Sequence, residues 1–150
     1  MRNLVLVVAG LGWRDLELRG MTRLCGLSFS PAQSVFPAVT CPAQGTVRTA
    51  TLPSAHGMTS NGYWNHQLFR PSFWEQSSSL VSGKRIWTPA RERGETVAVL
   101  FFQQSLGESV DFVLSPAPIH KHGGGMIMEN YVRPQNIVPL LNKVCGTFPL

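Results

Sequence analysis

The chain has 150 residues, of which 43% are hydrophobic and 14% are charged, and 13 basic and 8 acidic side chains give it a net charge of +5. The length allows one domain with a substantial core, although a charged fraction of about 25% is more usual. The basic residues are scattered and form no basic arm, so a mixed, solvated surface is favoured and no nucleic acid is expected as a specific partner.

The first predicted element is a strand at residues 3–9 (NLVLVVA), a continuous apolar run typical of a parallel strand buried on both faces. This run is too short for a signal peptide or a membrane span, so no membrane partner is expected. Glycines follow, and the apolar residues of 13–24 then recur at roughly helical spacing, interrupted at Gly20. A strand, a glycine turn and a helix indicate an α/β unit.

A loop is predicted at residues 26–37, and a helix at 40–49 with Thr40 as N-cap and Pro42 in the first turn. The segment "TLPSAHGMTSNGYWN" that follows is expected to be irregular.

The second half is predicted to contain a short helix, two strands, a glycine-rich loop and a last helix kinked by Pro139. These elements cover residues 85–93, 96–102, 111–116, 117–133 and 134–144. Their order indicates an α/β fold with an at least partly parallel sheet.

Thr40 is the first candidate site residue, because a hydroxyl at a helix N-terminus faces unpaired N–H groups and the positive end of the helix dipole. Such a place suits a phosphate, and it favours the alkoxide that a nucleophile must become. A simple N-cap is the alternative. Asn61 is the second candidate, because its amide can donate to an oxyanion; the alternative is an Asn-Gly hairpin turn.

Histidines and cysteines give weaker signals. His56 is either a ligand or general base, or a loop histidine bonded to local backbone, and the latter is favoured. Cys41 has no visible partner base and is interpreted as a packing residue. His120 and His122 in "IHKHGGG" are spaced like two metal ligands on a strand, but no acidic or cysteine cluster completes a set, so a polar loop is favoured. The three cysteines form no CxxC pair, which favours a reducing, cytoplasmic location.

Together, "NLVLVVAGLGWRDLELRG", "VFPAVTCPAQGTVRTATLPSAHGMTSNGYW" and "FWEQSSSLVSGKRIWTPARERG" resemble the amino-terminal part of the type I phosphodiesterase / nucleotide pyrophosphatase family, in the alkaline phosphatase superfamily. The resemblance implies an alkaline phosphatase-like fold, a mostly parallel sheet flanked by helices, with residues 1–150 as part of one such domain. It also implies hydrolysis of phosphoesters, phosphodiesters or nucleotide pyrophosphates, with a small phosphorylated substrate.

The same resemblance implies roles for the two candidates. Thr40 would attack phosphorus and bind one of two zinc ions, and Asn61 would contact a phosphoryl oxygen. Two metals would bracket the displacement.

Two departures favour an alternative. Ala9 stands where the family has a metal-binding Asp, and the family's later Asp and His ligands lie beyond the matched region, so the chain is expected to be incomplete as an enzyme. A smaller departure is Ala50, where a glycine is usual. A catalytically inactive relative that binds a phosphorylated ligand or a protein partner is the competing hypothesis, and a generic nucleic-acid-binding module has little support.

Overall fold

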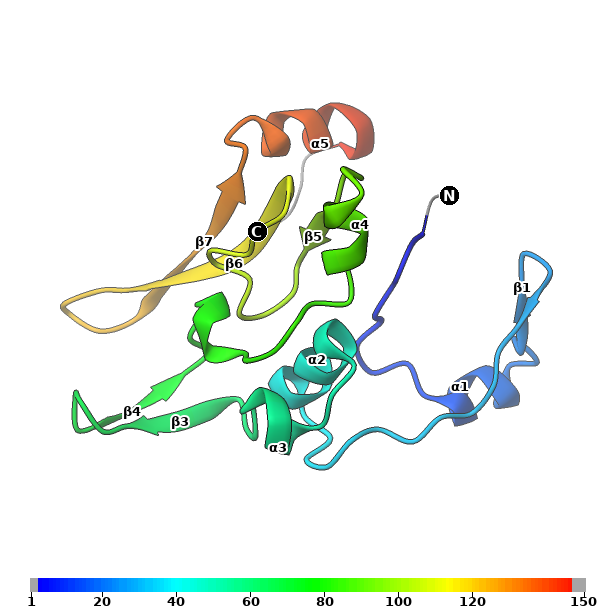
Figure 1. The fold of residues 1–150 in the computed structure, drawn as a ribbon, viewed down its shortest axis with the longest axis horizontal. Coiled ribbons are helices and arrows are strands. Elements are labelled where there is room, and N and C mark those ends of the chain that lie inside the picture. Colours follow the sequence, from blue (N-terminus) through cyan, green and yellow to red (C-terminus); the bar gives the residue numbers. More distant parts are fainter. Residues whose placement is uncertain (1–2, 147–150) are drawn as a thin grey trace. The chain divides into compact units, whose positions relative to one another are not determined.

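The structure is a computed structural model that describes residues 3–146. The chain divides into two compact units, Met1–Ser34 and Val35–Leu150, and each unit is described by itself. Figure 1 shows the elements of both. No helix among the described residues is long and apolar enough to cross a membrane.

The first unit contains a short helix and a two-stranded hairpin. Helix α1 (Trp13–Leu18) begins where the Asp15 carboxylate accepts a hydrogen bond from the Gly12 backbone N–H at 3.1 Å. It ends before Gly20, whose φ of 65° leaves the helical region. Strands β1 (Arg23–Leu24) and β2 (Leu27–Ser28) then pair antiparallel, so the predicted helix at 13–24 is correct only in its first half.

The buried strand predicted at residues 3–9 is wrong for this unit. Residues 3–8 adopt no regular structure, and Leu4 is 88% exposed. A strand needs a neighbour to take up its backbone hydrogen bonds, and the β1–β2 hairpin supplies none to this segment. The apolar run therefore has the composition of a strand, but no neighbouring strand in this unit pairs with it.

The second unit begins with helix α2 (Thr40–Thr49), which matches the predicted helix at both ends. The next segment is not irregular as predicted, because Pro53 starts a helical turn, α3 (Pro53–His56), that Gly57 ends with a φ of 83°. Two antiparallel strands follow, β3 (Gly62–Asn65) and β4 (Arg70–Phe73). A short 3₁₀ turn, η1 (Ser78–Leu80), completes this half of the unit.

The other half contains a three-stranded sheet in the order β5–β6–β7, drawn in green to orange in Figure 1. Strand β5 (Ala98–Leu100) runs parallel to β6 (Phe112–His120), whereas β7 (Met126–Arg133) runs antiparallel to β6. The mixed α/β class is therefore confirmed. The described residues contain one parallel strand pair, however, and not the mostly parallel sheet that was predicted.

The predicted glycine-rich loop at residues 117–133 is wrong, because most of it forms the β6–β7 hairpin. Two prolines, Pro116 and Pro118, obscured the strand. They lie beyond the three β6 residues that pair with β5, so the missing proline N–H groups leave no ladder bond to that strand unmade.

Helices α4 (Thr88–Glu92) and α5 (Ile137–Cys145) lie close to their predicted positions. Because α5 starts at Ile137, Pro139 falls in its first turn, where a missing N–H needs no partner, and the predicted kink has no cause.

Two small apolar clusters form the core of the second unit. One gathers Val99, Val110 and Val113 between β5 and β6, with Trp87 and Phe102 packed against it. The other gathers Cys41, Met58 and Val81 below the first turn of α2. The start of α2 is thus anchored on buried apolar surface, which matters for the candidate site.

Candidate active site at the start of helix α2

Thr40 lies at the start of α2, as the sequence predicts, and it is exposed. The prediction that it is the N-cap is wrong, because Val39 is the N-cap and Thr40 is the first helical residue. Val39 precedes it in extended conformation, with φ −120° and ψ 166°. Among the described residues, no group makes a hydrogen bond to the Thr40 hydroxyl. The hydroxyl therefore lies at the positive end of a ten-residue helix, open to a ligand.

Asn61 reaches the same helix end from the start of the β3–β4 hairpin. Its Oδ1 accepts a hydrogen bond from the backbone N–H of Cys41 at 2.9 Å. The predicted proximity of Asn61 to the start of α2 is therefore confirmed. The alternative of an Asn-Gly hairpin turn is wrong, because Gly62 is the first residue of β3 and the hairpin closes at residues 66–69.

This contact also determines how the Asn61 amide is turned. A backbone N–H is a donor, so the amide oxygen must be the atom that meets Cys41. The Nδ2 group then faces another direction and takes no partner among the described side chains. Asn61 thus caps the helix with its oxygen and keeps two N–H donors for an oxyanion.

Cys41 is a packing residue, as interpreted from the sequence. It is fully buried, and its Sγ accepts a hydrogen bond from Gln104 Nε2 at 3.0 Å. Burial raises the pKa of the thiol, and this effect outweighs the opposing ones of Gln104 and Arg48. A protonated, enclosed thiol is a poor nucleophile.

His56 is a structural residue bonded to nearby groups. Its side chain is fully buried, Nδ1 accepts from the Met58 backbone N–H at 3.2 Å, and Nε2 lies 3.0 Å from Thr46 Oγ1. Because Nδ1 is an acceptor, the proton is on Nε2. Burial, with a smaller contribution from the Arg48 charge, lowers the pKa of His56 and keeps the ring neutral. Both nitrogens are in use within the fold.

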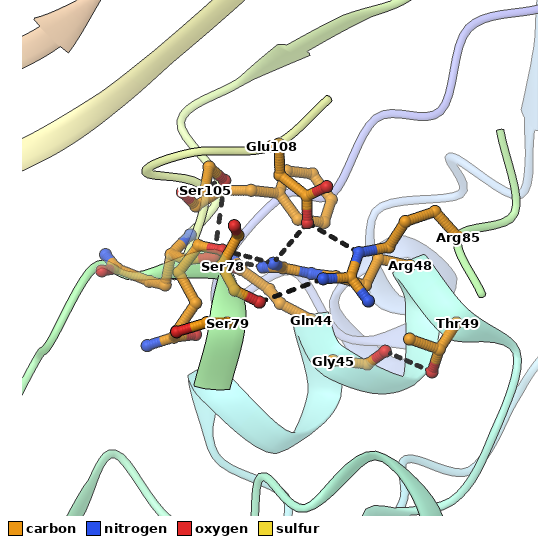
Figure 2. A network of polar contacts seen from close by, with 12 residues as sticks. Gln44, Gly45, Arg48, Thr49, Ser78, Ser79, Arg85, Ser105 and Glu108 are labelled. Atoms are coloured by element: carbon orange, nitrogen blue, oxygen red, sulfur yellow. Dashed lines mark hydrogen bonds and ion pairs between the residues drawn. The ribbon is translucent and has the colours of Figure 1, made fainter. Parts of the chain in front are cut away.

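Arg48, at the other end of α2, is the residue that sequence reasoning missed. Figure 2 shows its fully buried guanidinium between the helix and the segment after β5. Nη1 donates to the Gln104 carbonyl at 2.6 Å and lies 3.5 Å from Glu108 Oε1, and Nη2 donates to the Gln103 carbonyl. The guanidinium also lies 5.7 Å from the Phe102 ring centre.

The partners of Arg48 lie more than fifty residues further along the chain. Burial lowers its pKa to about 10, with Glu108 opposing that shift. In the sequence, Arg48 is only a basic residue in the last turn of a predicted helix. Exposed helix ends often carry such residues, so this position does not indicate burial.

No cluster of metal-binding side chains forms among the described residues. Within residues 3–146, no group of three or more His, Cys, Asp or Glu side chains is placed to hold an ion. His122 lies in the exposed turn after β6, outside the strand. Ala9, at the position of the expected Asp, belongs to the first unit. The described residues therefore do not by themselves fit a two-zinc centre.

The model of the family described as type I phosphodiesterase / nucleotide pyrophosphatase matches residues 3–141. A search of curated proteins found no significant match. The family match covers Thr40, Asn61 and the whole Arg48 network.

Proposed function

The chain belongs to the type I phosphodiesterase / nucleotide pyrophosphatase family, and from that premise we propose that it hydrolyses phosphodiesters with Thr40 as the nucleophile. Asn61 would donate from Nδ2 to a phosphoryl oxygen. Family membership indicates phosphodiesterase or pyrophosphatase activity, and the roles of the two residues are the proposal.

The observation that supports it most is the hydrogen bond between Cys41 N–H and Asn61 Oδ1 at 2.9 Å. This bond holds the Asn61 amide, at the start of the β3–β4 hairpin, beside Cys41, the residue that follows Thr40. A phosphate placed at the end of α2 would meet the Thr40 hydroxyl, the free amide protons of Asn61 and the positive helix end together. These groups act on the charge that grows on phosphoryl oxygens during displacement.

The proposed reaction has two steps. Thr40 Oγ forms a bond to phosphorus as the bond from phosphorus to the leaving oxygen breaks; the hydroxyl proton passes to solvent, and the leaving alkoxide takes up a proton. Water then attacks the phosphorus of the resulting Thr40 ester, which still carries the second ester group of the substrate. Its OH bonds to phosphorus, its proton goes to Thr40 Oγ, and a phosphomonoester leaves. In both steps, Asn61 Nδ2 and the helix end stabilise the phosphoryl oxygens.

Members of the family are generally metal-dependent, and Thr40 as a ligand of zinc or another divalent ion stays a prediction. The described residues supply no ligand cluster, so the steps above use protein groups only. The cytoplasmic location and the small phosphorylated substrate also stay predictions.

A second candidate function is binding without turnover. Ala9 in place of the expected Asp, together with the lack of a ligand cluster among the described residues, favours it. The same Thr40 and Asn61 groups would then hold a phosphorylated ligand and leave its ester bond intact.

The deciding experiment incubates the full chain with bis(p-nitrophenyl) phosphate, with and without added Zn²⁺, Mn²⁺ or Mg²⁺, and searches acid-quenched protein by mass spectrometry for peptides that carry a p-nitrophenyl phosphoryl group. Release of p-nitrophenolate is expected, with the p-nitrophenyl phosphoryl group on the peptide that contains residue 40. Thr40→Ala should abolish both, and Thr40→Ser, which keeps the hydroxyl, should retain them. Binding of inorganic phosphate without turnover under every condition would overturn the hydrolase and leave the binding protein.

A further inference from the structure

We infer that Gln104 is a positioning residue for the Thr40 site, acting through the thiol of Cys41. The inference rests on the proposed function, because it states how the nucleophile is held. Gln104 belongs to the segment after β5, more than sixty residues from Cys41 in sequence.

The Gln104 side chain is enclosed and its amide nitrogen is committed. The residue is 1% exposed, and Nε2 donates to Cys41 Sγ at 3.0 Å and to the Glu75 carbonyl at 3.1 Å. Its Oε1 is buried without a hydrogen-bond partner. Leaving an amide oxygen unpaired is unfavourable, so packing alone would favour an apolar side chain here.

Cys41 is consequently held from two sides by two distant segments. Asn61 binds its backbone N–H, and Gln104 binds its sulfur. Because Cys41 directly follows Thr40, these two contacts limit how the backbone of Thr40 can shift or rotate. A small displacement of a nucleophile is enough to slow a displacement reaction severely.

The segment that contains Gln104 also makes a hydrogen bond to the last turn of α2. Arg48 Nη1 donates to the Gln104 carbonyl at 2.6 Å, and the Gln104 N–H donates to Gln76 Oε1 at 3.2 Å. Cys41 and Arg48 are about 10 Å apart along the helix, two turns. Attachment at both points sets the direction of the helix axis as well as the location of its first residue. Gln104 has a φ of 50°, which a non-glycine residue keeps only where its surroundings enforce it.

The test compares Gln104→Met with Ser105→Ala in the full chain. Met has a similar size but lacks both amide donors. Ser105 is a matched control, because it is equally buried in the same segment, and its hydroxyl donates to the Phe102 carbonyl at 2.7 Å and not to α2. We expect Gln104→Met to lower kcat about tenfold with little change in KM, the size of one lost hydrogen bond, and Ser105→Ala to leave kcat unchanged.

Cys41→Ala shows whether the effect passes through the thiol. If it does, Gln104→Met added to Cys41→Ala should cause no further loss of kcat. The inference would be overturned if Gln104→Met lowered kcat by the same factor in the wild type and in Cys41→Ala. Equal kcat values for Gln104→Met and Ser105→Ala would also overturn it.

A second readout keeps failure of the inference distinct from failure of the proposed function. Absence of both turnover and a p-nitrophenyl phosphoryl group on Thr40 in the wild type would reject the proposed function alone. Amide hydrogen exchange at Cys41 measures the positioning directly, because it follows the N–H that Asn61 holds. We expect Gln104→Met to accelerate that exchange about tenfold relative to Ser105→Ala at matched global stability. Equal exchange rates would overturn the positioning role whether or not the chain is an active enzyme.

Discussion

Arg48 and Glu108 form a buried ion pair, with Nη1 and Oε1 3.5 Å apart and both side chains at most 5% exposed. Arg85 Nε also donates to Glu108 Oε1, at 2.6 Å. One carboxylate thus serves two guanidinium groups, as Figure 2 shows. Burial of this kind is favourable only while all partners are present.

Glu108→Gln should therefore destabilise the fold strongly. The variant keeps the size of the side chain but leaves Arg48 charged and uncompensated, and breaking such a buried pair costs about 3 kcal/mol or more. Urea unfolding followed by circular dichroism measures the loss. Glu92→Gln is the control, because Glu92 pairs with Lys84 in an exposed position, and it should have little effect. Similar losses of unfolding free energy in both variants would show that burial of the Arg48–Glu108 pair does not increase its contribution to stability.

Gly45→Ala should destabilise the chain although alanine is the better helix former. A Cβ on Gly45 would lie 2.7 Å from Cε1 of His56, whose ring is held by Thr46 and by the Met58 N–H. Overpacking of this kind costs about 1–3 kcal/mol, more than the helix propensity gained. Gly123→Ala, where a Cβ meets nothing within 4 Å, should be close to neutral. Thermal unfolding of the two variants measures the difference.

Ala50→Gly should stabilise the chain. Ala50 ends α2 with a φ of 53° and a ψ of 31°, the left-handed conformation that glycine adopts without strain. The gain should be about 1 kcal/mol, visible as a higher urea midpoint with unchanged slope. Gly57→Ala is the reverse experiment at the end of α3, where φ is 83°, and it should be destabilising. An Ala50→Gly variant no more stable than the wild type would show that α2 ends differently in solution.

Asn61→Asp and Asn61→Ala should separate the two roles of Asn61. Asp keeps an oxygen that accepts from Cys41 N–H, so the fold should be preserved, but it replaces the amide donor with a negative charge next to the bound phosphate. Ala removes both functions and should cost about 1 kcal/mol of stability as well. Turnover of bis(p-nitrophenyl) phosphate should be lost in both variants. Full activity in Asn61→Asp would contradict the proposed contact with the phosphoryl oxygen.

His56 should make stability fall in mild acid. Burial lowers its pKa in the folded state below the ordinary 6.5, so the unfolded chain binds a proton first as pH decreases. The stabilisation is fully present above pH 6.5 and is lost progressively as pH falls toward the folded-state value. Urea unfolding at a series of pH values between about 5 and 8 measures the slope. His56→Gln should flatten that slope.

Local signals in the sequence were sufficient for α2. A hydroxyl residue, an early proline and a following helical stretch predicted a helix over 40–49, and the structure has it at Thr40–Thr49. The family motif likewise brought Thr40 and Asn61 together correctly, since the Asn61 amide binds the residue after Thr40.

Features that depend on distant partners were not predictable in this way. The apolar run at 3–9 has strand propensity, but pairing partners decide whether it becomes a strand. The β6–β7 hairpin was obscured by prolines that are tolerated only because β5 is short. Arg48 looked like a surface base because nothing near it in sequence reveals the carbonyl groups of Gln103 and Gln104 that enclose it.

Because Cys41 is buried, the reactivity of its thiol can report when the first turn of α2 opens. Cys25 and Cys145 are exposed, whereas Cys41 is buried. An alkylating reagent should therefore label two thiols at once and the third only when the first turn of α2 detaches. The slow labelling rate would time the opening of the helix end that presents Thr40, without any substrate being known.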